Sequence, residues 1–89
     1  MLVSSKHMLQ KAKEQKYAVP AFNIHNFETL KAVVEAAQEE NSPLILQTTP
    51  GTCEFMGIEY IVAAAQIASK GVNIPIALHL DHCNSVEIA

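Results

Sequence analysis

Short apolar segments typical of strands alternate with longer amphipathic segments typical of helices. This order constrains the fold more than any other feature of the 89 residues. A helix followed by strand, helix, strand, helix and strand predicts an α/β domain with a parallel sheet and right-handed crossovers. The predicted helices cover residues 6–15, 27–40 and 57–69, and the predicted strands cover residues 17–22, 44–48 and 76–80.

Local signals mark the ends of the predicted helices. Ser4 and Ser5 are suited to cap the first helix and Asn26 to cap the second. Pro43 follows the end of the second helix, and Gly71 follows the third. The apolar stripes expected to face the sheet are Met8, Leu9 and Ala12 in the first helix, Leu30, Val33, Val34 and Ala37 in the second, and Ile58, Ile61, Val62, Ala65 and Ala68 in the third.

The strand segments differ in their expected surroundings. Residues 44–48 are apolar with almost no alternation, which predicts a strand covered on both faces. Pro20 weakens the prediction of a strand at residues 17–22, because proline cannot donate a ladder hydrogen bond. Residues 49–52, Thr-Pro-Gly-Thr, predict a turn between the second strand and the third helix.

The edges of the predicted sheet and the last residues suggest a larger whole. Three parallel strands leave two apolar edges, which a finished domain does not expose. Ser85 is suited to cap a further helix, of which residues 86–89 supply about one turn. We therefore expect these residues to be the first third of a longer chain. The alternatives are a frayed terminus and a free-standing α/β domain that pairs through its edges with a second copy.

Composition excludes some classes of function. Six Lys and no Arg against nine acidic residues give a net charge of −3, which argues against a basic nucleic-acid-binding surface. No apolar run approaches the roughly 20 residues that span a membrane. Two cysteines, Cys53 and Cys83, form no recognisable disulfide framework, so we expect a cytoplasmic protein.

Polar residues follow each predicted strand at its carboxyl end, in residues 23–26, 48–52 and 81–84. Ligands of parallel α/β proteins bind at this edge of the sheet. Asp81 is the one aspartate of the chain, and a carboxylate after a buried strand is costly unless its charge is used. In a barrel, strand alternation would direct His79 and Asp81 to the interior, whereas Leu78 and Leu80 would pack against helices.

The Asp81–His82 pair suits a metal ligand with a general acid or base beside it. Capping or a surface hydrogen bond would also explain the pair, because catalytic zinc usually takes three protein ligands. The remaining candidates are weaker. We expect His7 to be solvated, His25 to line a loop and Cys83 to pack.

Two further groups have a binding and a structural interpretation. Thr48, Thr49 and Thr52 with Gly51 resemble a loop whose hydroxyl and backbone N–H groups hold phosphate, or they form a Pro-Gly turn with self-satisfied threonines. The Asn23 amide suits a substrate-orienting role or an Asx turn.

Three segments in register resemble the N-terminal part of class II, zinc-dependent ketose-bisphosphate aldolases. They are Tyr-Ala-Val-Pro-Ala-Phe-Asn-Ile-His-Asn at 17–26, Ser-Pro-Leu-Ile-Leu-Gln-Thr-Thr-Pro-Gly-Thr at 42–52 and His-Leu-Asp-His at 79–82. The resemblance covers essentially all 89 residues. The segments at 20–26 and 49–52 are more similar to the tagatose-bisphosphate branch than to the fructose-bisphosphate branch.

The resemblance implies the N-terminal portion of a (β/α)₈ TIM barrel, a fold of about 250 residues. The implied reaction is reversible cleavage of a ketose 1,6-bisphosphate to dihydroxyacetone phosphate and glyceraldehyde 3-phosphate, with Zn²⁺ polarising the ketone. No Schiff-base lysine is required, in agreement with the absence of Lys from the predicted strand ends. The residues matched are Asp81 as the acid/base, His82 as a zinc ligand, Asn23 as a substrate-contacting amide and Thr49 as a hydroxyl near a phosphate.

The remaining zinc ligands and the Gly-rich phosphate loop of the family have no match here. We therefore expect the 89 residues alone to be inactive. The expected ligand is a phosphorylated sugar, and we expect no binding to nucleic acid or membrane. The complete protein is expected to be a homo-oligomer, either alone or together with a non-catalytic partner subunit. The alternative is that this chain is itself a non-catalytic partner or assembly module on the aldolase scaffold, although such a module has no reason to retain Asp81 and His82.

Overall fold

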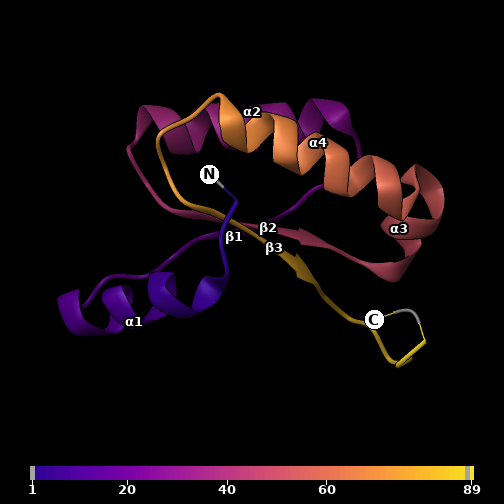
Figure 1. The fold of residues 1–89 in the computed structure, drawn as a ribbon, viewed down its shortest axis with the longest axis horizontal. Coiled ribbons are helices and arrows are strands. Elements are labelled where there is room, and N and C mark those ends of the chain that lie inside the picture. The colour runs from indigo at the N-terminus through magenta and orange to yellow at the C-terminus, as the bar shows by residue number, and fades with distance from the viewer. Residues whose placement is uncertain (1, 88) are drawn as a thin grey trace.

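The computed structural model describes residues 2–87 and 89 and confirms a parallel α/β fold (Figure 1). Its three strands pair in the order β1-β2-β3, and both pairs are parallel. The elements in chain order are α1 (Ser5–Gln15), β1 (Ala21–Asn23), α2 (Phe27–Glu39), β2 (Leu44–Thr48), α3 (Pro50–Met56), α4 (Ile58–Lys70) and β3 (Ile76–Leu80).

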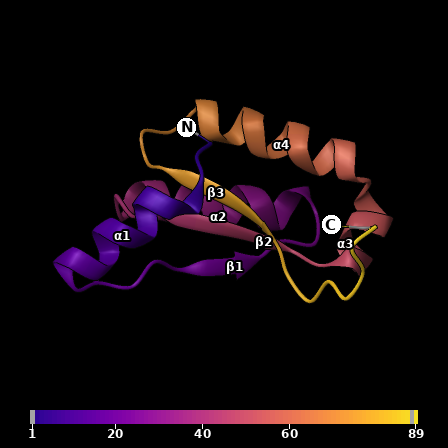
Figure 2. The same cartoon turned by 60° about the horizontal axis from the view of Figure 1, so that its bottom comes forward.

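The core lies between one face of the sheet and the helices α2 and α4, which run along the same side of it (Figure 1). Leu44 and Leu46 of β2 are fully buried there, with Ile76 of β3. The helix α1 lies at the end where the strands begin, and α3 lies at the opposite end (Figure 2). The helices α2 and α4 thus leave the second face of the sheet available for a site, and α3 lies beside the strand ends.

Burial along β2 corrects the prediction of a strand covered on both faces. Leu44, Leu46 and Thr48 are buried, whereas the alternating residues Ile45 and Gln47 are only half-buried. The helical residues of the buried core cluster come from α2 and α4 on one face of the sheet, and along β2 the alternating residues that face away from this cluster are less buried. In a (β/α)₈ barrel, the face of the sheet opposite the helices lines the interior of the barrel.

The first strand is shorter than predicted, because β1 begins only at Ala21. Pro20 has no N–H, and its carbonyl accepts a 2.9 Å hydrogen bond from the Ile45 N–H. The predicted turn at 49–52 is also wrong, since the helix α3 begins there. Pro50 takes the first helical position, where its missing N–H is no loss, and Thr49 caps the helix.

The predicted cap of α2 is confirmed. The Thr29 N–H donates to Asn26 Oδ1 at 2.8 Å, and Thr29 Oγ1 accepts from the Asn26 N–H at 3.2 Å. Before α4, Gly57 has φ +93°, and a Cβ there would lie 3.0 Å from Tyr60 Cδ2. A side chain at this link would therefore be strained as well as crowded.

Three residues of the predicted apolar stripes are exposed instead. They are Leu9 on α1 and Ile58 and Val62 on α4. Ile58 and Val62 line a hollow beside the edge strand β3 together with Leu80. Their apolar character is therefore matched to the sheet edge and not to the core between α2 and α4.

The last residues differ from the predicted helix at 86–89. Val86 and Glu87 form a turn, and Ile88 lies outside the described residues. The Ser85 hydroxyl donates a 2.7 Å hydrogen bond to the Glu87 carboxylate, which lowers the pKa of Glu87. None of the helices in residues 2–87 has the length and apolar character needed to cross a membrane.

Candidate active site at the strand ends

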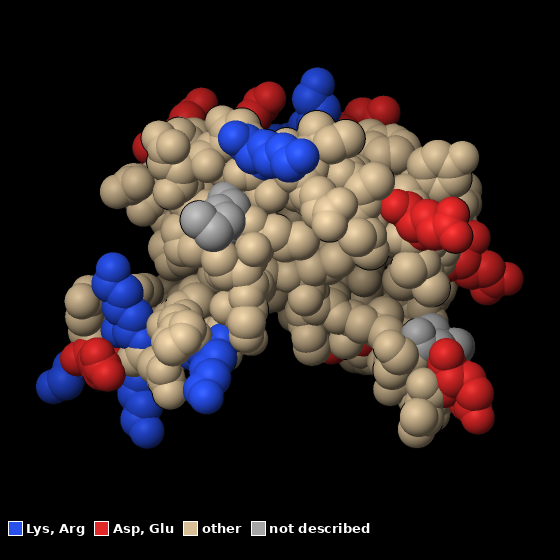
Figure 3. Space-filling model, viewed as in Figure 1, with Lys and Arg blue, Asp and Glu red and all other residues tan. Residues whose placement is uncertain are grey.

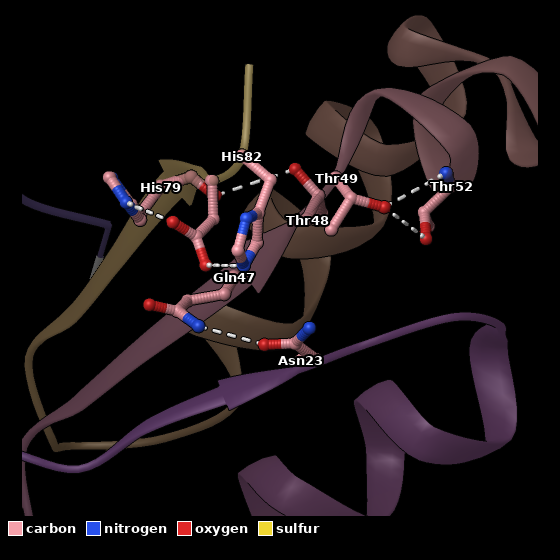
Figure 4. A network of polar contacts seen from close by, with 8 residues as sticks. Asn23, Gln47, Thr48, Thr49, Thr52, His79 and His82 are labelled. Carbon is pink, nitrogen blue, oxygen red and sulfur yellow. Dashed lines mark hydrogen bonds and ion pairs between the residues drawn. The ribbon is translucent and has the colours of Figure 1, made fainter. Parts of the chain in front are cut away.

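A row of polar side chains crosses the face of the sheet that the helices leave open (Figure 4). Asn23 in β1 pairs in register with Gln47 in β2, which pairs in register with His79 in β3. All three lie in the last two residues of their strands, so they meet at the carboxyl edge. The sequence predicted a site at this edge, and the register brings these residues together there.

Asp81 directly follows β3 and extends its pairing by one residue, because its N–H donates a 2.7 Å hydrogen bond to the Thr48 carbonyl. Its carboxylate lies between two imidazoles. Oδ1 is 3.7 Å from His79 Nε2, and Oδ2 is 3.6 Å from His82 Nε2. The side chain is 33% exposed. The carboxylate is therefore held at the edge of the sheet while remaining accessible to a ligand.

His82 reaches this carboxylate because its backbone is left-handed, with φ 56°. Consecutive residues of a regular strand point to opposite faces, which would separate Asp81 from His82. The positive φ turns the chain after Asp81 and returns the imidazole to the same side. The side chain of His82 is 81% exposed, so its ring lies at the rim of the strand ends.

Asn23 is held by a side chain that sequence reasoning did not select. The Gln47 Nε2–H donates to Asn23 Oδ1 at 2.8 Å, which fixes the orientation of the Asn23 amide. The available signal was the polar Gln47 after the apolar residues 44–46 of the predicted strand. Since strand residues alternate between faces, Gln47 had to face away from the core.

Thr49 lies next to this row, but its hydroxyl is already engaged at the start of α3. Thr49 Oγ1 accepts from the Thr52 N–H and lies 3.3 Å from Thr52 Oγ1. Thr52 Oγ1 is in turn 3.2 Å from His25 Nδ1. The hydroxyl of Thr48 donates to the His79 carbonyl at 3.4 Å. The three threonines thus organise the strand ends from within the protein.

Lysines lie away from the strand ends. Figure 3 shows the basic side chains gathered over α1, whereas acidic side chains dominate the opposite end of the molecule. Lys6, Lys11 and Lys13 belong to α1, and Lys16 follows it. Among the described residues, no lysine follows a strand at its carboxyl end, so an amine nucleophile is missing from this part of the site.

The donor set fits part of a metal site. The exposed imidazole of His82 is a suitable ligand for a transition metal. Within residues 2–87 and 89, however, no group of three His, Cys, Asp or Glu side chains is arranged to hold an ion. The described residues therefore offer one ligand where a catalytic zinc needs three.

Comparison with known proteins places this geometry in a family. The family model described as fructose-bisphosphate aldolase class-II matches residues 3–89. The crystal structure of the YdjI aldolase from Escherichia coli K12 is similar over 99% of this chain, with 30% identity and a TM-score of 0.89. Fructose-bisphosphate aldolase from Campylobacter jejuni is similar over 92%, with 29% identity and a TM-score of 0.70.

The chain spans 34% of the E. coli structure and 28% of the C. jejuni structure, about a third of each. The three strands and their helices correspond to the N-terminal part of the aldolase TIM barrel, as the sequence predicted. Match, fold and strand-end residues agree, and the chain belongs to the class II fructose-bisphosphate aldolase family.

Proposed function

We propose that these residues form the first three strands of a class II aldolase barrel that reversibly cleaves a ketose 1,6-bisphosphate to dihydroxyacetone phosphate and glyceraldehyde 3-phosphate. The observation that carries the proposal is the Asp81 carboxylate, which lies between two imidazoles at the carboxyl end of β3. In a (β/α)₈ barrel this edge carries the catalytic residues.

In the proposed reaction, Asp81 exchanges the proton of the hydroxyl on the fourth carbon of the sugar as the carbon–carbon bond breaks or forms. Its partly exposed carboxylate suits proton exchange with a bound ligand. Asn23, oriented by Gln47, holds substrate through its amide. Thr49 contributes its hydroxyl near a phosphate, with α3 fixing its position.

His82 is the proposed contribution of this chain to zinc binding, because it is the exposed imidazole next to Asp81. When bound, zinc supplies an electrophile for the ketone oxygen of the substrate. The other ligands would come from other strands of the barrel. The role of the protein groups described above is to orient the substrate and to move one proton.

For the sugar, we propose tagatose 1,6-bisphosphate over fructose 1,6-bisphosphate. The support is the similarity of the segments 20–26 and 49–52 to the tagatose-bisphosphate branch. These segments lie at two of the three strand ends. These two substrates differ in configuration at one carbon, so a contact near the reacting hydroxyl is sufficient to discriminate between them.

The test is an assay of dihydroxyacetone phosphate release by the complete aldolase chain with each of the two sugar bisphosphates. We expect cleavage of both, with a higher kcat/KM for the tagatose isomer. We also expect activity to be lost with a chelator and restored by Zn²⁺. Absence of cleavage by the zinc-loaded chain would contradict the proposal and favour a non-catalytic partner subunit.

The 89-residue chain alone is expected to bind zinc weakly. Its described residues supply the imidazole of His82 but no group of three ligands, and a catalytic zinc site usually has three protein ligands. Isothermal titration calorimetry with Zn²⁺ measures this, and the His82→Gln variant is the matched control. We expect no saturable tight site in either protein and no release of dihydroxyacetone phosphate. A tight one-to-one site that disappears in His82→Gln would show that the described residues suffice for binding.

A further inference from the structure

The side chain of His79 contacts the carboxylate to which the proposed function gives the proton transfer. His79 and Asp81 lie two residues apart, so strand alternation directs them to the same side of the sheet. His79 Nε2 lies 3.7 Å from Asp81 Oδ1, and His82 Nε2 lies 3.6 Å from Asp81 Oδ2. Each carboxylate oxygen therefore faces a different imidazole.

The two imidazoles are anchored differently. His79 lies within β3, in register with Gln47 of β2, and its carbonyl accepts a hydrogen bond from the Thr48 hydroxyl. Thr48 also accepts the Asp81 N–H through its carbonyl, so one residue of β2 holds the backbone of both His79 and Asp81. His82 lies beyond the strand and is 81% exposed. Of the two partners of Asp81, His79 is thus the one whose backbone is fixed by the sheet, and its side chain is the less exposed of the two, at 52%.

A carboxylate needs such a partner because rotation about its Cβ–Cγ bond is weakly restricted. The backbone of Asp81 is fixed by its hydrogen bond to Thr48, but this leaves the plane of the carboxylate free. The imidazole of His79, 3.7 Å from Oδ1, lies within ion-pair range of the carboxylate. This contact favours one orientation of the carboxylate and leaves Oδ2 facing the ring of His82.

We infer that His79 is a positioning residue that holds Asp81 Oδ1, so that Oδ2 is presented to the substrate hydroxyl. The inference rests on the proposed function, in which Asp81 exchanges that proton. The substrate contacts Asp81 and not His79, so loss of His79 lowers kcat and leaves KM nearly unchanged.

Two variants of the complete aldolase chain separate this role from packing. In His79→Gln, an amide N–H can face Oδ1 in place of the imidazole Nε2. His79→Leu keeps a similar volume and removes the polar contact with Oδ1. We expect His79→Leu to lower kcat by about 10–100-fold with KM and zinc content unchanged, whereas His79→Gln recovers most of kcat.

Both variants are then combined with Asp81→Asn in a double-mutant cycle. We expect His79→Leu to have no further effect on kcat once the carboxylate is absent. An equal loss in both backgrounds, a loss of zinc in His79→Leu, or a failure of His79→Gln to recover kcat would overturn the inference. If Asp81→Asn alone retains wild-type turnover, the proposed function fails instead. Because this single variant keeps His79, its result tests the proposed function separately from the inference on His79.

Discussion

Replacing Asp81 by asparagine in the complete aldolase chain is expected to lower kcat by about 10²–10⁴-fold, the range that general acid–base catalysis contributes. Asparagine keeps the shape of the side chain and cannot exchange a proton at the substrate hydroxyl. The backbone N–H of residue 81, which holds the strand end through its hydrogen bond to the Thr48 carbonyl, is unaffected. Steady-state cleavage kinetics and zinc content measured on the same preparation provide the test.

The control for Asp81→Asn is Glu59→Gln, which removes a carboxylate from an exposed position in α4 without touching the strand ends. We expect this control to retain wild-type kinetics. Full zinc occupancy of Asp81→Asn would show that the loss of turnover does not follow from a lost metal. Turnover within about twofold of wild type would be too small an effect for general acid–base catalysis and would remove Asp81 from the proposed mechanism.

The elements with the clearest local signals were predictable from sequence. Residues 44–48 and 76–80 are β2 and β3 without any change of boundary. Asn26 was recognised as a cap because its side chain can satisfy an otherwise unpaired N–H of the helix. Where the chemistry of one residue determines the local structure, as at Asn26, periodicity and capping were sufficient.

The differences arise where tertiary context decides. Thr-Pro-Gly-Thr is compatible with a turn or with a capped helix start, and only the structure shows α3. Burial of residues 44–48 on both faces was expected from their apolar character, but the described helices cover one face. The position of Asp81 and Asn23 in the site was predictable from strand ends, whereas Gln47 emerged from the register between β1 and β2.

The left-handed backbone of His82 is a feature that the sequence did not indicate, and it determines how a zinc ligand should be tested. Histidine at φ 56° is already in a region that favours glycine. A His82→Ala variant would combine loss of the imidazole with an unfavourable backbone. His82→Gly and His82→Asn both tolerate this conformation, so they remove the imidazole without adding strain.

In the complete chain, we expect both His82→Gly and His82→Asn to weaken zinc binding by more than about 100-fold, because loss of even an outer-shell partner costs about 10–100-fold. Turnover should fall with zinc occupancy. The free energy of unfolding of the metal-free protein should change by less than about 1 kcal/mol, since the side chain is 81% exposed and glycine favours the positive φ. Metal content by atomic absorption and urea unfolding of the metal-free variants measure the two effects separately. Zinc retained at wild-type occupancy would exclude His82 as a ligand. Loss of zinc with unchanged stability would show that His82 contributes to metal binding and not to folding, as expected of an exposed ligand at the rim.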